Sequence, residues 1–487
     1  MPRHDPEGTR LPIKVDSTSN GEYEPIPLSP RNDAANRRAM EHATANARRL
    51  GISRRDFLIS TAGAATTLLA FNEVNAAAGK KGVFYDIPKD AALDRDLAAS
   101  LLDGEEFIFD VHGHFANPNG EWLKMVPPGE NPVLRPGYEI SAERFIKDVF
   151  LDSDTDMMVL TFIPSMADAE PLTIEEAAAT QKIIDELEGT KRLLIHGRVN
   201  PNQDGDIERM ERLARDFDVV GWKTYTQWGP AENAYHSLET GLGFDLTDPR
   251  YGIPFIERAR DIGIRNICIH KGIPFGREES YRYARCDDIG KAARMFPDMN
   301  FLVYHAGFDP MVPERGFEPG AGRDGIDSLV QSLLDHDIGP GSNVYADVGT
   351  TFNLFRRDPD TAAHGMGKLL KHVGEDNVLW GTDSIWTGSP QDQIQVWRTF
   401  QIAPELRERH GYPEITPELR AKVFGLNACK PYNISAEEVK LRAPNDRIGT
   451  TRTGYREDPD PLFQTYGPRT YDEFLNLLSW KGGKLGD

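Results

Sequence analysis

The chain has 487 residues, a formal net charge of -20 at pH 7 and a pI near 5.1. This acidic balance argues against nucleic acid or an anionic membrane surface as a partner. Hydrophobic residues make up 39 % of the chain, so most of it can build a buried core and only a minor part can be disordered. No apolar run reaches the ~18–20 residues of a stable membrane span.

The first 78 residues differ in composition from the rest. Residues 1–52 are polar and rich in Pro, Asn, Ser and Arg, which predicts a disordered leader. Residues 53–78 begin with Ser-Arg-Arg-Asp-Phe-Leu, continue into a mildly apolar stretch and end on small residues with an A-x-A-like site. The paired arginines resemble a twin-arginine signal, which predicts export of the folded protein by the twin-arginine machinery, to the bacterial periplasm. The alternative is a short amphipathic helix that begins near Arg54, and cleavage of the signal stays open.

Strand-like apolar runs recur eight times in the body of the chain, with helical patterns between most of them. Such alternation implies parallel strands, and eight of them predict a closed (β/α)8 TIM barrel over residues 79–434. An open doubly wound sheet is disfavoured because no Gly-x-Gly-x-x-Gly turn follows the first run. The charged segment 435–487 is expected to pack on the barrel or on a neighbouring subunit. The runs are 107–114, 156–163, 192–199, 219–225, 265–270, 300–305, 343–348 and 377–383.

Potential metal ligands and proton-transfer residues stand at the ends of these runs. His112 and His114 are separated by one residue on a strand, so their side chains point the same way and can bind one divalent metal. Taken alone, any one of these residues could be a core residue whose polar group is hydrogen-bonded to the backbone. In a barrel the carboxyl ends of the strands share one face, so together they predict a site there. The later members are Lys223, His270, His305 and Asp383.

Six short motifs resemble the amidohydrolase superfamily, in the branch that includes aminocarboxymuconate-semialdehyde decarboxylase and γ-resorcylate decarboxylase. The resemblance covers residues 107–431 and leaves out the leader and the last stretch. As a set, the motifs are specific for the superfamily but do not identify a substrate. They are Asp-Val-His-Gly-His at 110–114, Ile-His-Lys-Gly at 269–272, Tyr-His-Ala-Gly at 304–307, Tyr-Ala-Asp at 345–347, Trp-Gly-Thr-Asp at 380–383 and Gly-Leu-Asn-Ala at 425–428.

The resemblance implies one divalent metal, commonly zinc, bound by His112, His114, His270 and Asp383. It also implies His305 as the proton-transfer residue. Such a metal lowers the pKa of its water from 15.7 to about 7. Asp383 could hydrogen-bond this water while it contacts the metal, so the predicted catalytic pair is His305 and Asp383.

Lys223 has three interpretations: a carboxylated bridge between two metals, a cationic contact to a substrate carboxylate, or a structural ion pair. Arg198 could bind a substrate carboxylate through its planar fork. Tyr225 could shape an aromatic pocket, and Trp386 could close the other side of the site. Arg198 and Tyr225 could equally be packing.

The sequence therefore predicts a metal-dependent hydrolase acting on a small carbonyl, amide, ester or lactone substrate. The first alternative is a metal-dependent non-oxidative decarboxylase of an unsaturated or aromatic carboxylic acid. The second alternative is a non-catalytic barrel that binds a metal or ligand. A homo-oligomer is compatible with the sequence, which does not fix the oligomeric state.

Overall fold

Eight parallel strands form one sheet in chain order in the computed structural model. The structure describes residues 3–118, 140–167, 170–185, 191–230, 242–275, 278–320 and 324–474. The strands are β2 (Phe109–Gly113), β3 (Met157–Leu160), β4 (Leu193–Arg198), β5 (Val219–Tyr225), β6 (Asn266–His270), β7 (Asn300–Tyr304), β8 (Val344–Asp347) and β9 (Val378–Leu379). Each falls within one predicted apolar run.

Backbone hydrogen bonds close this sheet into a barrel. The Val111 N–H donates to the Trp380 carbonyl at 2.9 Å, and the Asp383 N–H donates to the His112 carbonyl at 2.8 Å. The first and last strands therefore meet, and the predicted (β/α)8 barrel is confirmed. The closure also brings Asp383 beside His112, although the two residues are 271 positions apart in the sequence. The barrel topology therefore places these two predicted site residues together.

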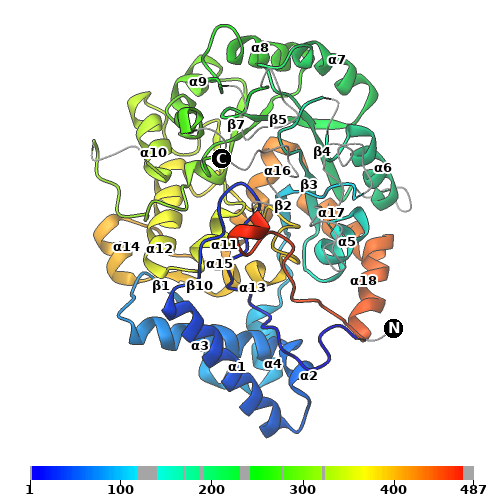
Figure 1. Cartoon of the computed structure of the whole chain (residues 1–487), viewed down its shortest axis with the longest axis vertical. Coiled ribbons are helices and arrows are strands. Elements are labelled where there is room, and N and C mark those ends of the chain that lie inside the picture. Colours follow the sequence, from blue (N-terminus) through cyan, green and yellow to red (C-terminus); the bar gives the residue numbers. More distant parts are fainter. Residues whose placement is uncertain are drawn as a thin grey trace.

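Helices surround the strands (Figure 1). The strand interior is filled by a cluster that includes Phe109, Val111, Met157, Leu194 and Leu302, and a larger cluster joins the strands to the helices. The helices of the barrel are α5 (Ala142–Ile146), α6 (Ile174–Asp185), α7 (Asp206–Asp216), α8 (Gly252–Ile262), α9 (Ile289–Met295), α10 (Ile326–Asp335), α11 (Thr351–Phe355), α12 (Pro359–Lys368), α13 (Gln391–Thr399), α14 (Pro404–His410), α15 (Pro417–Ala421) and α16 (Asn427–Tyr432). A two-stranded sheet pairs β1 (Val83–Tyr85) with β10 (Phe400–Ile402).

The polar leader is folded in the structure, which differs from the predicted disorder. Its helix α1 (Pro30–Leu50) begins after the Ser29 cap and ends at Gly51, which has a φ of 68°. Alanines at every fourth position of α1 are buried, because small side chains on one helix face allow close packing against α3 (Thr61–Ala77). These alanines are Ala35, Ala39, Ala43 and Ala47.

The paired arginines also lie in ordered structure. They begin the short helix α2 (Arg54–Leu58), where Arg55 is 4 % exposed and its guanidinium lies 2.6 Å from Asp460. Phe57 is fully buried, and α3 is in contact with α4 (Arg95–Leu102). In the described part of the chain, no helix has the length and apolarity to cross a membrane. Export by the twin-arginine machinery stays a prediction.

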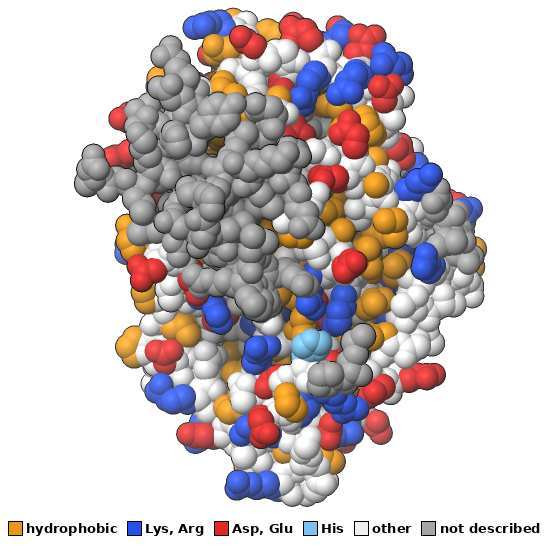
Figure 2. All heavy atoms as spheres, turned by 45° about the vertical axis from the view of Figure 1, so that its right-hand side comes forward, with side chains coloured by type: hydrophobic (Ala, Val, Ile, Leu, Met, Phe, Trp, Pro, Cys, Tyr) orange, Lys and Arg blue, Asp and Glu red, His pale blue; other side chains and the backbone are white. Residues whose placement is uncertain are grey.

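The end of the chain packs on the barrel through α17 (Ala436–Arg442) and α18 (Arg447–Glu457). Arg192 at the start of β4 forms a buried ion pair with Asp446, and Arg452 donates to the Phe150 carbonyl at 2.6 Å. Figure 1 shows the N-terminal segment, in dark blue, crossing the barrel beside the red C-terminal segment. Figure 2 shows acidic and basic side chains mixed over the described part of one face.

Candidate metal centre

Three of the predicted ligands converge at the carboxyl ends of β2 and β9. His112 Nε2 lies 3.1 Å from His114 Nε2 and 3.4 Å from Asp383 Oδ1, and His114 Nε2 lies 3.2 Å from the same oxygen. All three side chains are at most 4 % exposed. Two ligands that each lie about 2.1 Å from a tetrahedral metal are about 3.4 Å apart, so this triangle fits one cation.

The tautomers of the two histidines support this fit. His112 Nδ1 lies 2.9 Å from Asp347 Oδ2, and His114 Nδ1 lies 3.0 Å from the Thr161 carbonyl oxygen. Because both partners accept hydrogen bonds, each Nδ1 carries the proton and each Nε2 presents a lone pair. Two lone pairs that face each other at 3.1 Å repel, and a bound cation turns this repulsion into attraction.

Burial keeps the His112 imidazole neutral, as metal ligation requires. Burial lowers the pKa of His112 well below its usual range, and the nearby Lys223 ammonium lowers it further. Asp347 holds the ring from behind, and burial raises the pKa of this carboxyl to about 7. Asp110 ties β2 to the β9 end, since it accepts hydrogen bonds from the backbone N–H groups of His112 and Thr382.

Strained backbone places the two predicted catalytic residues. His305 has a φ of 64° and Asp383 a φ of 57°, in the left-handed region that residues with a Cβ rarely adopt. Such strain persists where the surrounding structure holds it, and it is common at functional sites. Here His305 directly follows β7, and Asp383 lies four residues beyond the end of β9.

His305 lies between His112 and His270, with ring centroids 4.9 Å and 4.4 Å away. Its Nδ1–H donates to the Gly349 carbonyl at 2.7 Å. Its Nε2 is buried and has no hydrogen-bond partner among the described residues. Burial lowers the pKa of His305 to about 3, and the neighbouring His270 adds to this shift. The ring is therefore neutral and offers a free lone pair at Nε2.

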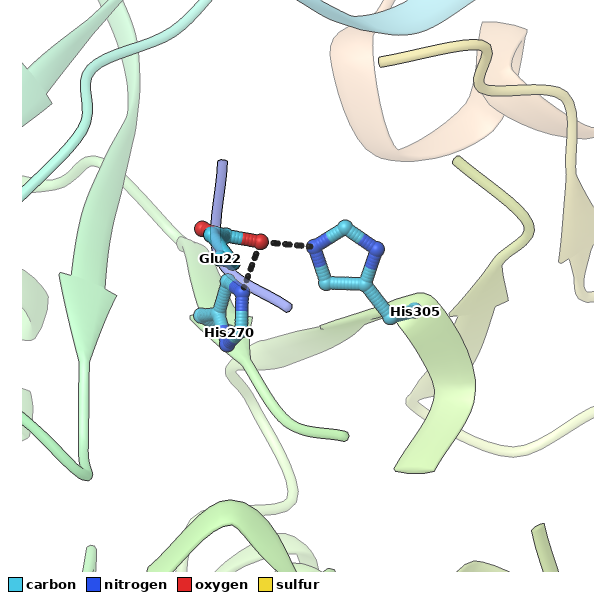
Figure 3. A group of neighbouring side chains, drawn as sticks. All are labelled: Glu22, His270 and His305. Carbon is cyan, nitrogen blue, oxygen red and sulfur yellow. Dashed lines mark hydrogen bonds and ion pairs between the residues drawn. The ribbon is translucent and has the colours of Figure 1, made fainter. Parts of the chain in front are cut away.

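His270 stands apart from the triangle, on the far side of His305. Its Nε2 lies 3.1 Å from Glu22 Oε2, and the same oxygen lies 4.0 Å from His305 Nε2 (Figure 3). Tyr225 stacks on the His270 ring with centroids 4.5 Å apart. The predicted site residue Tyr225 therefore contacts the site through His270.

Lys223, from β5, has a fully buried amine without a hydrogen-bond partner among the described residues. The amine lies 3.5 Å from the centre of the Tyr304 ring, a cation–π contact. Burial lowers the pKa of Lys223 to about 8. No described carboxylate forms an ion pair with Lys223, so the structural ion pair expected as one of its three interpretations is absent from this part of the chain.

Two expected substrate contacts have other roles. Arg198 is 4 % exposed and forms ion pairs with Glu170 at 2.7 Å and Asp206 at 3.1 Å. These two carboxylates already pair with its guanidinium, and its binding of a substrate carboxylate stays a prediction. Trp386 is 3 % exposed and belongs to the core, while its carbonyl accepts from the Tyr466 and Gly467 N–H groups. It holds the C-terminal segment over the site.

Glu22 and Asn20 are site residues that the sequence did not predict. The Asn20 amide donates to Asp383 Oδ2 at 2.8 Å and to Glu22 Oε2 at 2.7 Å. Both residues come from the polar leader, where no local pattern marks them. Asp347 lies within a recognised motif, but its contact with His112 depends on the closure of the barrel.

The sequence profile of the family described as Amidohydrolase matches residues 109–434. No curated protein matches the chain. An uncharacterised TIM-barrel protein from Bordetella bronchiseptica is 15 % identical, with a TM-score of 0.41 over 69 % of this chain and 99 % of its own.

Two similar solved structures are decarboxylases. A 2,6-dihydroxybenzoate decarboxylase from Rhizobium is 16 % identical, with a TM-score of 0.37 over 68 % of this chain and 99 % of its own. A dihydroxybenzoic acid decarboxylase from Polaromonas, with bound manganese, is 14 % identical, with a TM-score of 0.36 over 68 % of this chain and 97 % of its own. At these identities, none of the activities carries over to this chain.

Proposed function

The chain belongs to the amidohydrolase family, and from this premise we propose that it is a metal-dependent hydrolase of a small carbonyl, amide, ester or lactone substrate. The observation that carries the proposal is the convergence of the His112 and His114 Nε2 lone pairs on Asp383. Structural packing gives no reason for two unprotonated nitrogens to face each other, whereas a cation does. A barrel that only binds metal would not need the free His305 Nε2 beside this triangle.

His112, His114 and Asp383 would hold the metal, and His270, on the far side of His305, would be the fourth ligand that the family pattern implies. We propose zinc, because imidazole and carboxylate donors both bind it well. When bound, it would act as a Lewis acid and make a water nucleophilic near neutral pH. Asp383 Oδ2, which accepts from Asn20, stays directed toward the same space.

His305 would move the proton. Its Nδ1–H is fixed by the Gly349 carbonyl, so Nε2 is the atom that accepts a proton from the attacking water. The same nitrogen can then return the proton to the leaving group. Such general acid–base assistance is typically worth about 10²–10⁴-fold in rate, so His305→Ala should slow turnover by that factor.

Lys223 favours a second candidate, a metal-dependent decarboxylase. Its buried amine faces the barrel interior without a hydrogen-bond partner among the described residues, so the carboxylate of a substrate could pair with it. In that reaction the carboxylate leaves as CO₂, and a proton replaces it on the carbon atom. The water oxygen does not enter the product.

Product analysis in ¹⁸O-labelled water separates the two candidates. The metal-loaded enzyme is incubated with a panel of lactones, esters, amides and aromatic acids, with His305→Ala and the surface variant His42→Ala beside it. We expect one ¹⁸O atom in the acid product, a 10²–10⁴-fold loss in His305→Ala and no loss in His42→Ala. Release of CO₂ together with an organic product that contains no ¹⁸O would refute the hydrolase and support the decarboxylase.

A further inference from the structure

The N-terminal segment 18–23 is built into the mouth of the barrel. Thr18 Oγ1 donates to Thr465 Oγ1 at 2.7 Å, and the Ser19 N–H donates to the Pro468 carbonyl at 2.9 Å. The Tyr23 hydroxyl donates back to the Thr18 carbonyl at 3.1 Å, and Ser19 is fully buried. The segment is therefore held on both sides, by its own hydrogen bonds and by the C-terminal segment.

This segment brings Glu22 against the histidines of the site (Figure 3). The Glu22 side chain is 10 % exposed, and its Oε2 lies 3.1 Å from His270 Nε2. This distance falls within the range of 3.1–3.4 Å that separates the ligand atoms of His112, His114 and Asp383. The distance from Oε2 to His305 Nε2 is longer, 4.0 Å.

Asn20 joins these two groups of ligand atoms. Its Nδ2 lies 2.7 Å from Glu22 Oε2 and 2.8 Å from Asp383 Oδ2, so one amide holds both carboxylates. Carboxylates that share a donor in this way face the same space. His305 Nε2, buried and without a hydrogen-bond partner among the described residues, lies 4.0 Å from Glu22 Oε2 and within 4.8 Å of a ligand atom of Asp383.

We propose that Glu22 is a ligand of the divalent cation, supplied from outside the barrel by the N-terminal segment. The inference rests on the metal site of the proposed function. The ligand atoms of Glu22, His270 and His305 lie within 4.8 Å of one another, and so do those of His112, His305 and Asp383. A cation bound by His112, His114, His270, Asp383 and Glu22 would draw these two groups together into a set of three imidazoles and two carboxylates. In octahedral coordination this set leaves one position for water or substrate, and His305 stays outside the shell as the proton carrier.

Ligation by His270 Nε2 requires the proton on its Nδ1. The side-chain nitrogen of Gln227 lies 3.2 Å from that Nδ1, and its Oε1 has no hydrogen-bond partner among the described residues. The two amide orientations of a glutamine have nearly the same shape. Turning the Gln227 amide by 180° gives up its hydrogen bond to the Ile273 carbonyl at 3.2 Å, makes Gln227 Oε1 the acceptor of the His270 Nδ1–H, and leaves the His270 Nε2 lone pair for the cation.

Titration calorimetry with Mn²⁺ alone tests the proposal on the full chain. Glu22→Gln keeps the shape of the side chain and removes its charge, and Glu24→Gln changes an exposed glutamate two residues away. We expect Glu22→Gln to weaken Mn²⁺ binding at least about tenfold and Glu24→Gln to leave it unchanged. Unchanged or tighter binding in Glu22→Gln would overturn the proposal, and tighter binding would make Glu22 a competitor for the site.

Two further measurements distinguish a failure of the Glu22 proposal from a failure of the metal site itself. His114→Ala should abolish Mn²⁺ binding; if it binds like the wild type, the metal site of the proposed function fails, whatever Glu22 does. An anomalous-scattering map of the Mn²⁺-loaded wild-type crystal needs no variant. A Mn²⁺ peak within about 2.2 Å of a Glu22 oxygen supports the proposal, and a peak beyond about 3 Å overturns it.

Discussion

Asp347 supports the metal site without belonging to the proposed ligand set, and its substitution gives a quantitative prediction. Its Oδ2 accepts the Nδ1 proton of His112 at 2.9 Å, and both side chains are fully buried. Asp347→Asn keeps the shape but loses the charge that fixes the His112 tautomer. Loss of such a partner typically weakens metal binding about 10–100-fold, which corresponds to about 1.4–2.7 kcal/mol.

Competitive titration of Zn²⁺ against a chelator measures this loss. Asp337→Asn is the matched control, because Asp337 is 88 % exposed in a surface ion pair and its φ of 53° is one that asparagine tolerates. We expect the control to bind zinc like the wild type. Unchanged affinity in Asp347→Asn would refute the positioning argument, and a loss far beyond 100-fold would make Asp347 a direct ligand.

Three further predictions concern Arg198, Lys223 and the N-terminal residues. Arg198→Ala removes one of the two arginines that pair with the Glu170 and Asp206 carboxylates and leaves the partly exposed Arg209, so urea unfolding should show about 1–3 kcal/mol of lost stability; a change in KM alone would make Arg198 a substrate contact. Lys223→Met should keep one metal per chain by elemental analysis, and a fall from two to one would indicate a carboxylated bridge. The purified protein should retain residues 53–78 in N-terminal sequencing and peptide mass mapping, because they supply core side chains such as Phe57 and Leu68; a chain that begins near residue 79 would contradict this.

The sequence predicts the barrel well because its signals are local. Each strand is an apolar run, and the polar residue at each strand end is visible in the same run. His112 and His114 needed only the alternation of side chains along one strand to be assigned to one face. The barrel topology then predicted that His305 and Asp383 lie at the same end of the barrel as these two histidines.

Long-range contacts, which the sequence does not show, determine the remaining features of the fold and the site. The leader looks disordered by composition, yet the four-residue spacing of Ala35 and Ala39 in α1 buries a face of this helix against α3. The ion pairs of Arg198 with Glu170 and Asp206 could not be predicted, because both partners lie on other segments. Glu22 has no local signature, since only the folded chain brings it to His270.

The central claim is that His112, His114 and Asp383 bind one catalytic divalent metal. Elemental analysis of the purified wild type and of His114→Ala tests it most directly. The account predicts about one metal ion per wild-type chain and a background level in the variant, with the fold retained by circular dichroism. A wild type without metal after loading with Zn²⁺, or a variant that keeps its metal, would contradict it.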